Sequence, residues 1–109
     1  MTRYRVIITP SAERDIEQAY LWIAERDEDA AARWFNRLLD VVNTLETFPE
    51  RCPVAPESVM LGVEIRQILH GKRQHKYRVL FNVRGKTVNV LHVRHGARLP
   101  MRGSGRAEG

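Results

Sequence analysis

The spacing of apolar residues changes twice along this 109-residue chain, and the order of the changes restricts the folds open to it. Residues 3–9 alternate in the manner of a β-strand. From 10 to 48 the apolar residues recur every three or four positions, which indicates helix, and an acidic cluster at 27–29 divides the stretch in two. Three strand-like runs follow, at 63–70, 76–83 and 87–95. The order β-α-α-β-β-β predicts an α+β fold with a helical hairpin packed on a mainly antiparallel four-stranded sheet.

The ends of the two helices can be placed from single residues. Thr9 and Ser11 are residue types that cap a helix, and Pro10 suits the first helical turn. In the second helix one apolar stripe is expected to face the sheet, and Pro49 is expected to end the helix. The stripe consists of Trp34, Leu38, Val41, Leu45 and Phe48.

Length and composition predict one domain. Residues 1–98 contain all the periodic segments, whereas 99–109 are rich in Gly and Arg and poor in apolar residues, so we expect a flexible tail there. The chain has no apolar run near the roughly 20 residues of a membrane span. It also has no signal-peptide pattern and only one cysteine, Cys52. These features predict a cytoplasmic protein with no membrane partner.

Charge is distributed unevenly. Residues 1–62 hold 7 Lys/Arg against 11 Asp/Glu, whereas residues 63–98 hold 9 Lys/Arg against the single carboxylate of Glu64. If the helices cover one face of the sheet, the basic side chains of the last three strands are left on the other face. A cationic surface of this kind attracts nucleic acid or an acidic protein segment. The alternative is a solvated basic face that only maintains solubility.

Four segments, in this order, resemble the RelE/ParE superfamily of bacterial type II toxins, which also includes plasmid stabilisation proteins. The segments are residues 8–16 (ITPSAERDI), 63–66 (VEIR), 77–81 (YRVLF) and 91–98 (LHVRHGAR). The resemblance implies a toxin of a type II toxin–antitoxin system, with a cognate antitoxin as partner. An acidic antitoxin segment fits the basic balance of the chain, and contact with operator DNA would come only through the antitoxin.

In the RNA-cleaving branch of the superfamily, the resemblance implies ribosome-dependent cleavage of messenger RNA without a metal or other cofactor. The ribose 2′-hydroxyl attacks the neighbouring phosphate, which needs a base, an acid and a cation to stabilise the transition state. Arg78 and Arg94 correspond to the phosphate-binding arginines of this branch. His92 or His95 is the candidate acid or base because histidine titrates near neutral pH. Glu64 is a second candidate base.

The remaining basic residues of the C-terminal third are candidates for contact with the nucleic acid or another target. They are Arg66, Lys72, Arg73, Lys76 and Arg98. The sequence departs from the RNA-cleaving pattern after the last strand, where Gly96 and Ala97 stand in a stretch that typically carries a tyrosine or histidine.

Three functions remain open, and the sequence favours the first only slightly. The first is a messenger-RNA endoribonuclease that acts at the ribosome. The second is ParE-like inhibition of DNA gyrase by binding, which needs no acid–base set. The third is a basic nucleic-acid-binding domain without toxicity.

Overall fold

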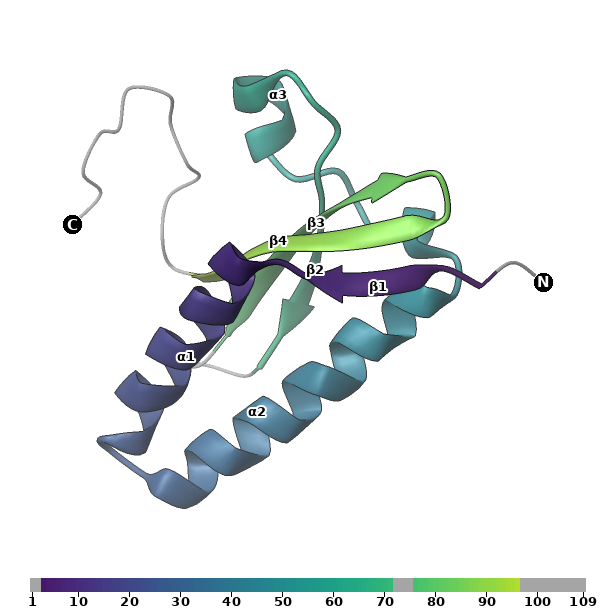
Figure 1. Ribbon diagram of the computed structural model, residues 1–109. Helices are drawn as coiled ribbons and strands as arrows, with labels where there is room; N and C mark the ends of the chain where they lie inside the picture. The colour runs from purple at the N-terminus through teal and green to yellow at the C-terminus, as the bar shows by residue number, and fades with distance from the viewer. Residues whose placement is uncertain (1–2, 72–75, 97–109) are drawn as a thin grey trace.

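Four strands form one mixed sheet in the computed structural model, which describes residues 3–71 and 76–96 (Figure 1). The strands lie in the order β1-β4-β3-β2. The first and last strands of the chain pair in parallel, which places β1 at one edge of the sheet beside β4, and the other pairings are antiparallel. Their bounds are β1 Arg5–Ile8, β2 Arg66–His70, β3 Tyr77–Arg84 and β4 Thr87–His95.

Two helices, α1 (Pro10–Ala24) and α2 (Glu28–Asn43), form the predicted hairpin and pack on one face of the sheet (Figure 1). Thr9 caps α1 by accepting a hydrogen bond from the Ala12 amide, and its hydroxyl donates to the Val90 carbonyl of β4. This pair of bonds fixes the start of α1 to the central strand. Asp27 caps α2 by accepting a hydrogen bond from the Ala30 amide, so the acidic cluster at 27–29 separates the two helices as predicted.

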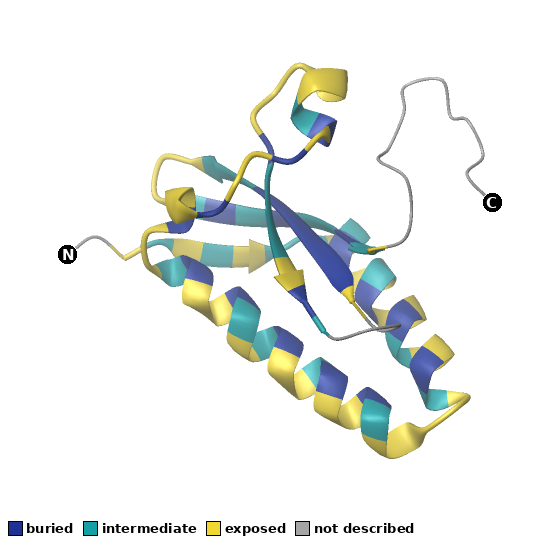
Figure 2. Ribbon diagram, turned by 180° about the vertical axis from the view of Figure 1, so that it is seen from behind, coloured by how far each residue is buried: buried dark blue, intermediate teal, exposed yellow. Residues whose placement is uncertain are grey.

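The main core lies between the hairpin and the sheet. Helix residues on both facing stripes are buried against alternate residues of β3 and β4, and Figure 2 shows the buried stripe facing inward on each helix. The fully enclosed side chains of this core include Ile23, Leu38, Leu45, Val79, Phe81, Val88 and Val90. The predicted α+β architecture is therefore confirmed. No helix in the described part of the chain is long and apolar enough to cross a bilayer.

The second helix ends earlier than predicted. It stops at Asn43, and a short 3₁₀ helix, η1 (Thr44–Glu46), continues the path of the chain. Phe48 adopts a left-handed conformation with φ of 47° and is 63% exposed, so its assignment to the buried stripe is wrong. The physical reason is Pro49, which disfavours helical geometry in the residue before it.

The loop from 49 to 62 contains two short helices, η2 (Pro49–Arg51) and α3 (Glu57–Leu61). Strand β2 starts at Arg66, three residues later than predicted. Ile65, just before it, joins Ala55, Leu80 and Leu91 in a second, small apolar cluster. Leu80 lies on β3 between two residues of the main core, so this cluster lies on the face of the sheet opposite the hairpin.

Candidate functional site

The face of the sheet opposite the hairpin carries Arg78, the second residue of β3. Its guanidinium donates to both carboxylate oxygens of Glu57, at 3.1 and 2.5 Å, and to the side-chain oxygen of Gln67 at 2.8 Å. Glu57 is fully buried and Arg78 is 8% exposed. Glu57 is the first residue of α3, so this ion pair attaches α3 to the sheet. A two-pronged arginine–carboxylate pair shielded from water is among the stronger polar contacts in proteins.

Arg94 is the direct neighbour of Arg78 across the β3–β4 ladder. Directly opposed residues of an antiparallel pair point to the same face, so these two candidate phosphate-binding arginines lie side by side. The Arg94 Nε atom is buried and has no hydrogen-bond partner among residues 3–71 and 76–96. Two arginine charges therefore lie side by side on this face, and the buried carboxylate of Glu57 pairs with one of them, Arg78.

Arg66 does not join this pair. It lies opposite Phe81 in the β2–β3 ladder, three residues from the position opposite Arg78, and so on the other face of the sheet. Its guanidinium donates to the carbonyls of Glu50 and Cys52 and lies 3.4 Å from Glu64. Arg66, a candidate for contact with the nucleic acid or another target, therefore does not share a site with Arg78 and Arg94. Its contacts hold the loop around η2 against β2.

The candidate acid–base residues point in different directions. His92 lies opposite Leu80, but its Nδ1 is 3.1 Å from a carboxylate oxygen of Asp15 on α1. That same oxygen accepts the Val93 amide at 3.0 Å, beyond the point where β1 stops pairing with β4. Asp15 thus accepts a hydrogen bond from a β4 amide that β1 does not pair with, and it also holds the His92 imidazole in place.

His95 lies opposite Tyr77 and stacks edge to face on its ring, with centroids 5.1 Å apart. It follows Arg94 directly, so it points to the hairpin face of the sheet, away from the two arginines. Glu64 precedes β2 and is exposed beside Arg66. Neither His95 nor Glu64 thus lies on the face that carries Arg78.

The remaining predicted binding residues are only partly described. Lys76 is exposed immediately before β3, and its carbonyl accepts the Gly96 amide at 2.7 Å. Lys72, Arg73 and Arg98 lie outside the described residues.

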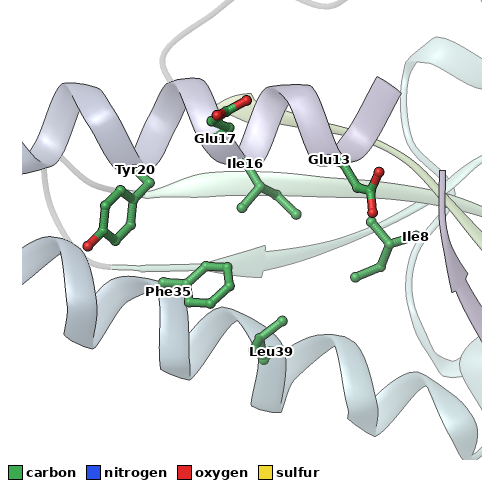
Figure 3. Close-up of a pocket in the computed structure, with 7 residues that line it drawn as sticks. All are labelled: Ile8, Glu13, Ile16, Glu17, Tyr20, Phe35 and Leu39. Carbon is green, nitrogen blue, oxygen red and sulfur yellow. The ribbon is translucent and has the colours of Figure 1, made fainter. Parts of the chain in front are cut away.

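A groove of about 580 Å³ opens between α1 and α2, on the far side of the main core from the arginines (Figure 3). Tyr20 from α1 and Phe35 from α2 meet edge to face across it, with ring centroids 6.1 Å apart. Figure 3 shows Glu13 on α1 pointing toward Ile8 at one end. The full lining is Ile8, Glu13, Ile16, Glu17, Tyr20, Phe35 and Leu39. The groove is apolar and its only charged lining groups are carboxylates.

On the other side of α2, His70 lies in a tilted stack on Trp34, and its Nε2 is 2.9 Å from the Trp34 carbonyl. Burial lowers the pKa of His70 below its ordinary value of 6.5, and the nearby charge of Arg37 lowers it further, whereas the hydrogen bond to Trp34 opposes the shift. His70 therefore stays neutral at pH 7 and acts as a core residue.

Two functional contacts were missed in the sequence. Glu57 was not singled out, although it is the only carboxylate among residues 51–63, in a run that is otherwise largely apolar. A lone acidic residue in such a run is a signal for a buried ion pair. The contact between Asp15 and His92 has no such signal, because no local pattern links residues 77 positions apart.

The fold matches a solved structure described as the chromosomal ParDE TA system from P. aeruginosa, with a TM-score of 0.67 and 16% identity, covering 85% of this chain and 96% of the other. A related protein, Toxin RelE1 of Caulobacter vibrioides, is 28% identical over 93 residues, which span 85% of this chain and 94% of the relative.

Residues 6–100 match the family described as "ParE toxin of type II toxin-antitoxin system, parDE". The match covers most of the chain, so the protein belongs to this family of type II toxins, within the RelE/ParE superfamily. Membership implies a cognate antitoxin as a partner.

Proposed function

We propose that this toxin acts by binding its target, as a ParE-like inhibitor of DNA gyrase, and does not cleave messenger RNA. The observation that carries the proposal is the state of Arg78. Its guanidinium is directed at a fully buried carboxylate of the same chain, Glu57. A phosphate-binding arginine must instead present its donors to the substrate at the reacting phosphate.

The energetic argument supports the same choice. Taking the partner away from a buried ion pair costs about 3–5 kcal/mol because a charge is left without compensation. An RNA phosphate that displaced Glu57 would take Arg78 away from that buried carboxylate. Substrate binding would have to offset this cost before any chemistry began.

The positions of the acid–base candidates also support binding over cleavage. General acid–base catalysis needs each group within hydrogen-bond reach of the proton that it moves. His92 is directed at Asp15 of α1 and His95 at the ring of Tyr77 on β3, so neither is directed at the guanidinium of Arg78. A toxin that inhibits by binding needs none of these groups in a common site.

Expression of the chain in growing bacteria without its antitoxin tests the proposal. We expect double-strand DNA breaks and an SOS response, while messages stay intact and protein synthesis continues in the first minutes. Rapid translation arrest with messages cut inside ribosomes, lost in Arg78→Ala, would refute the proposal and restore the endoribonuclease. Growth unaffected by expression would leave only a nucleic-acid-binding domain without toxicity.

The groove between α1 and α2 supports a proposal for the antitoxin as well. An amphipathic segment that folds on contact can place apolar side chains between Tyr20, Phe35 and Leu39. The rim carries Glu13 and Glu17, so the part of the antitoxin at this groove should be apolar with basic neighbours. An acidic part of the same antitoxin suits the basic sheet residues instead.

A further inference from the structure

The four described strands contain five arginines and no Asp or Glu. Contacts within the chain hold Arg66 and Arg78. The guanidinium groups of Arg5 and Arg84, in contrast, form no hydrogen bond or ion pair within residues 3–71 and 76–96, and both residues are exposed. Their charges therefore remain available to an anionic partner from outside the chain.

The strand register places these two arginines in one row across the sheet. Thr87 of β4 pairs with Arg5 of β1 on one side and with Arg84 of β3 on the other. The next residue, Val88, is buried in the main core, so this row points to the face opposite the hairpin. Two strand spacings separate the Cα atoms of the two arginines by about 10 Å.

A third cation lies at the same end of the sheet. Lys86, in the β3–β4 turn, is exposed, and its carbonyl accepts the Arg5 amide at 2.8 Å. We call Arg5, Arg84, Lys86 and Thr87 the turn-end patch. Figure 1 shows this turn at the end of the sheet where β1 begins, away from the loop that joins α1 and α2. Arg84 lies six positions along β3 from Arg78, which corresponds to about 20 Å, so the patch is separate from the buried pair.

The row next to the patch on the same face is largely polar. Asn89 pairs with Ile7 on β1 and with Asn82 on β3, and its side-chain amide donates to the Asn82 oxygen at 3.0 Å. These two described rows hold no aromatic residue, and Ile7, 37% exposed, is their one apolar residue. The exposed Leu69 lies in the row of Arg94 at the other end of this face, where an acidic antitoxin segment finds both an apolar and a cationic partner.

We infer that the turn-end patch binds the phosphate backbone of duplex DNA without reading its sequence. The centre of a protein–protein interface is apolar and poor in charge, and the patch is the reverse. Single-stranded nucleic acid is held by bases stacked on aromatic side chains, which the two rows lack. Duplex DNA carries one negative charge per about 1.7 Å of its axis, so cations alone can hold it.

The inference rests on the proposed function in one respect. Duplex DNA is the substrate of gyrase, so a toxin bound to that enzyme is held close to DNA. Weak contacts from three cations then add to the affinity for gyrase, because the second contact forms within one complex.

Binding of the full chain to a short fluorescent DNA duplex, measured by polarisation at several salt concentrations, tests the inference. The duplex has an arbitrary sequence, and the matching single strand and an RNA duplex of the same sequence are compared with it. The test variant removes the three charges of the patch: Arg5→Gln/Arg84→Gln/Lys86→Gln. The matched control removes three exposed charges from the helical hairpin: Arg14→Gln/Arg33→Gln/Arg37→Gln. Urea unfolding verifies that both variants are folded.

We expect the wild type to bind the DNA duplex more tightly than the single strand or the RNA duplex. The test variant should bind it at least tenfold more weakly at low salt, and the control should bind like the wild type. The slope of log K against log salt should flatten by about 2–3 in the test variant, because each lost phosphate contact removes about 0.9. Antitoxin binding, measured by calorimetry, should be unchanged in the test variant.

Four results would overturn the inference. The first is a wild-type chain that does not bind the DNA duplex at low salt. The second is equal weakening in both variants, because net charge alone then explains the binding. The third is tighter binding to the single strand or to the RNA duplex. The fourth is a tenfold loss of antitoxin binding in the test variant but not in the control, because the patch then belongs to the antitoxin.

The inference and the proposed function can fail separately. A wild-type chain that binds the DNA duplex through the patch but leaves gyrase unaffected refutes the proposed target, and the patch stands as a DNA-binding surface. A wild-type chain that inhibits gyrase, with DNA binding that does not depend on the three charges, refutes only the inference.

Discussion

Substitution of Glu57 by Gln tests whether the buried pair with Arg78 holds the fold together at α3. Gln keeps nearly the same size and can still accept one hydrogen bond, but it removes the negative charge. Arg78 would then retain only neutral partners, including Gln67 at 2.8 Å, in a place where it is 8% exposed. The prediction therefore isolates the effect of the charge from the effect of volume.

The structure sets the expected size of the loss. Glu57 is fully buried and meets the guanidinium through two hydrogen bonds. Removal of one member of such a pair costs about 3–5 kcal/mol, out of a total unfolding free energy of about 5–15 kcal/mol for a chain of ordinary stability. The exposed carboxylate of Glu64, 3.4 Å from Arg66, provides the matched control. The same Glu→Gln change there should cost less than about 1 kcal/mol.

Urea unfolding followed by circular dichroism measures both losses. The double variant Glu57→Leu/Arg78→Met removes both charges, and we expect it to recover most of the stability lost in Glu57→Gln. A loss below about 1 kcal/mol in Glu57→Gln, equal to that of Glu64→Gln, would mean that water reaches the pair. The argument that Arg78 is unavailable to a phosphate would then fail.

Three further predictions concern separate parts of the molecule. Because the pKa of His70 is below 6.5 in the folded chain, the unfolded chain binds more protons just below pH 6.5, and the free energy of unfolding should fall as pH drops through that value. Urea unfolding at several pH values should show a weaker pH dependence in His70→Gln, and an unchanged dependence would contradict a neutral, buried His70. Burial raises the pKa of the Cys52 thiol, against an opposing effect of Arg51 and Arg66, so iodoacetamide should label this thiol only in denaturant. Rapid labelling of the native chain would show that the loop around Cys52 is open to solvent. Leu39→Arg in the groove should weaken antitoxin binding at least tenfold, measured by calorimetry. The wild-type complex should largely survive molar salt because salt does not screen apolar contacts, and full dissociation in salt would show that the basic residues of the sheet are the main antitoxin-binding surface.

Local patterns were enough to predict the fold. Apolar periodicity and the caps at Thr9 and Asp27 place both long helices and the order of the strands. The errors lie where a single residue overrides the period. Pro49 forces Phe48 out of the helix and into solvent, although its spacing fits the buried stripe.

The candidate site was harder to predict because its geometry depends on register and on distant contacts. Arg78 and Arg94 come together only through the β3–β4 pairing, and Arg66 is separated from them by an odd offset in the β2–β3 pairing. The alternation of strand residues does not reveal that α3 brings Glu57 across to Arg78, 21 positions away. Basic residues that look like an open cationic face in the sequence are thus partly neutralised within the fold.

The most direct test of the central claim is a DNA supercoiling assay with purified gyrase, relaxed plasmid and the purified toxin. Inhibition by binding predicts that supercoiling stops as the toxin approaches stoichiometric amounts, and that addition of the cognate antitoxin restores it. Supercoiling that proceeds unchanged in excess toxin, from a preparation that still arrests growth when expressed, would contradict the account.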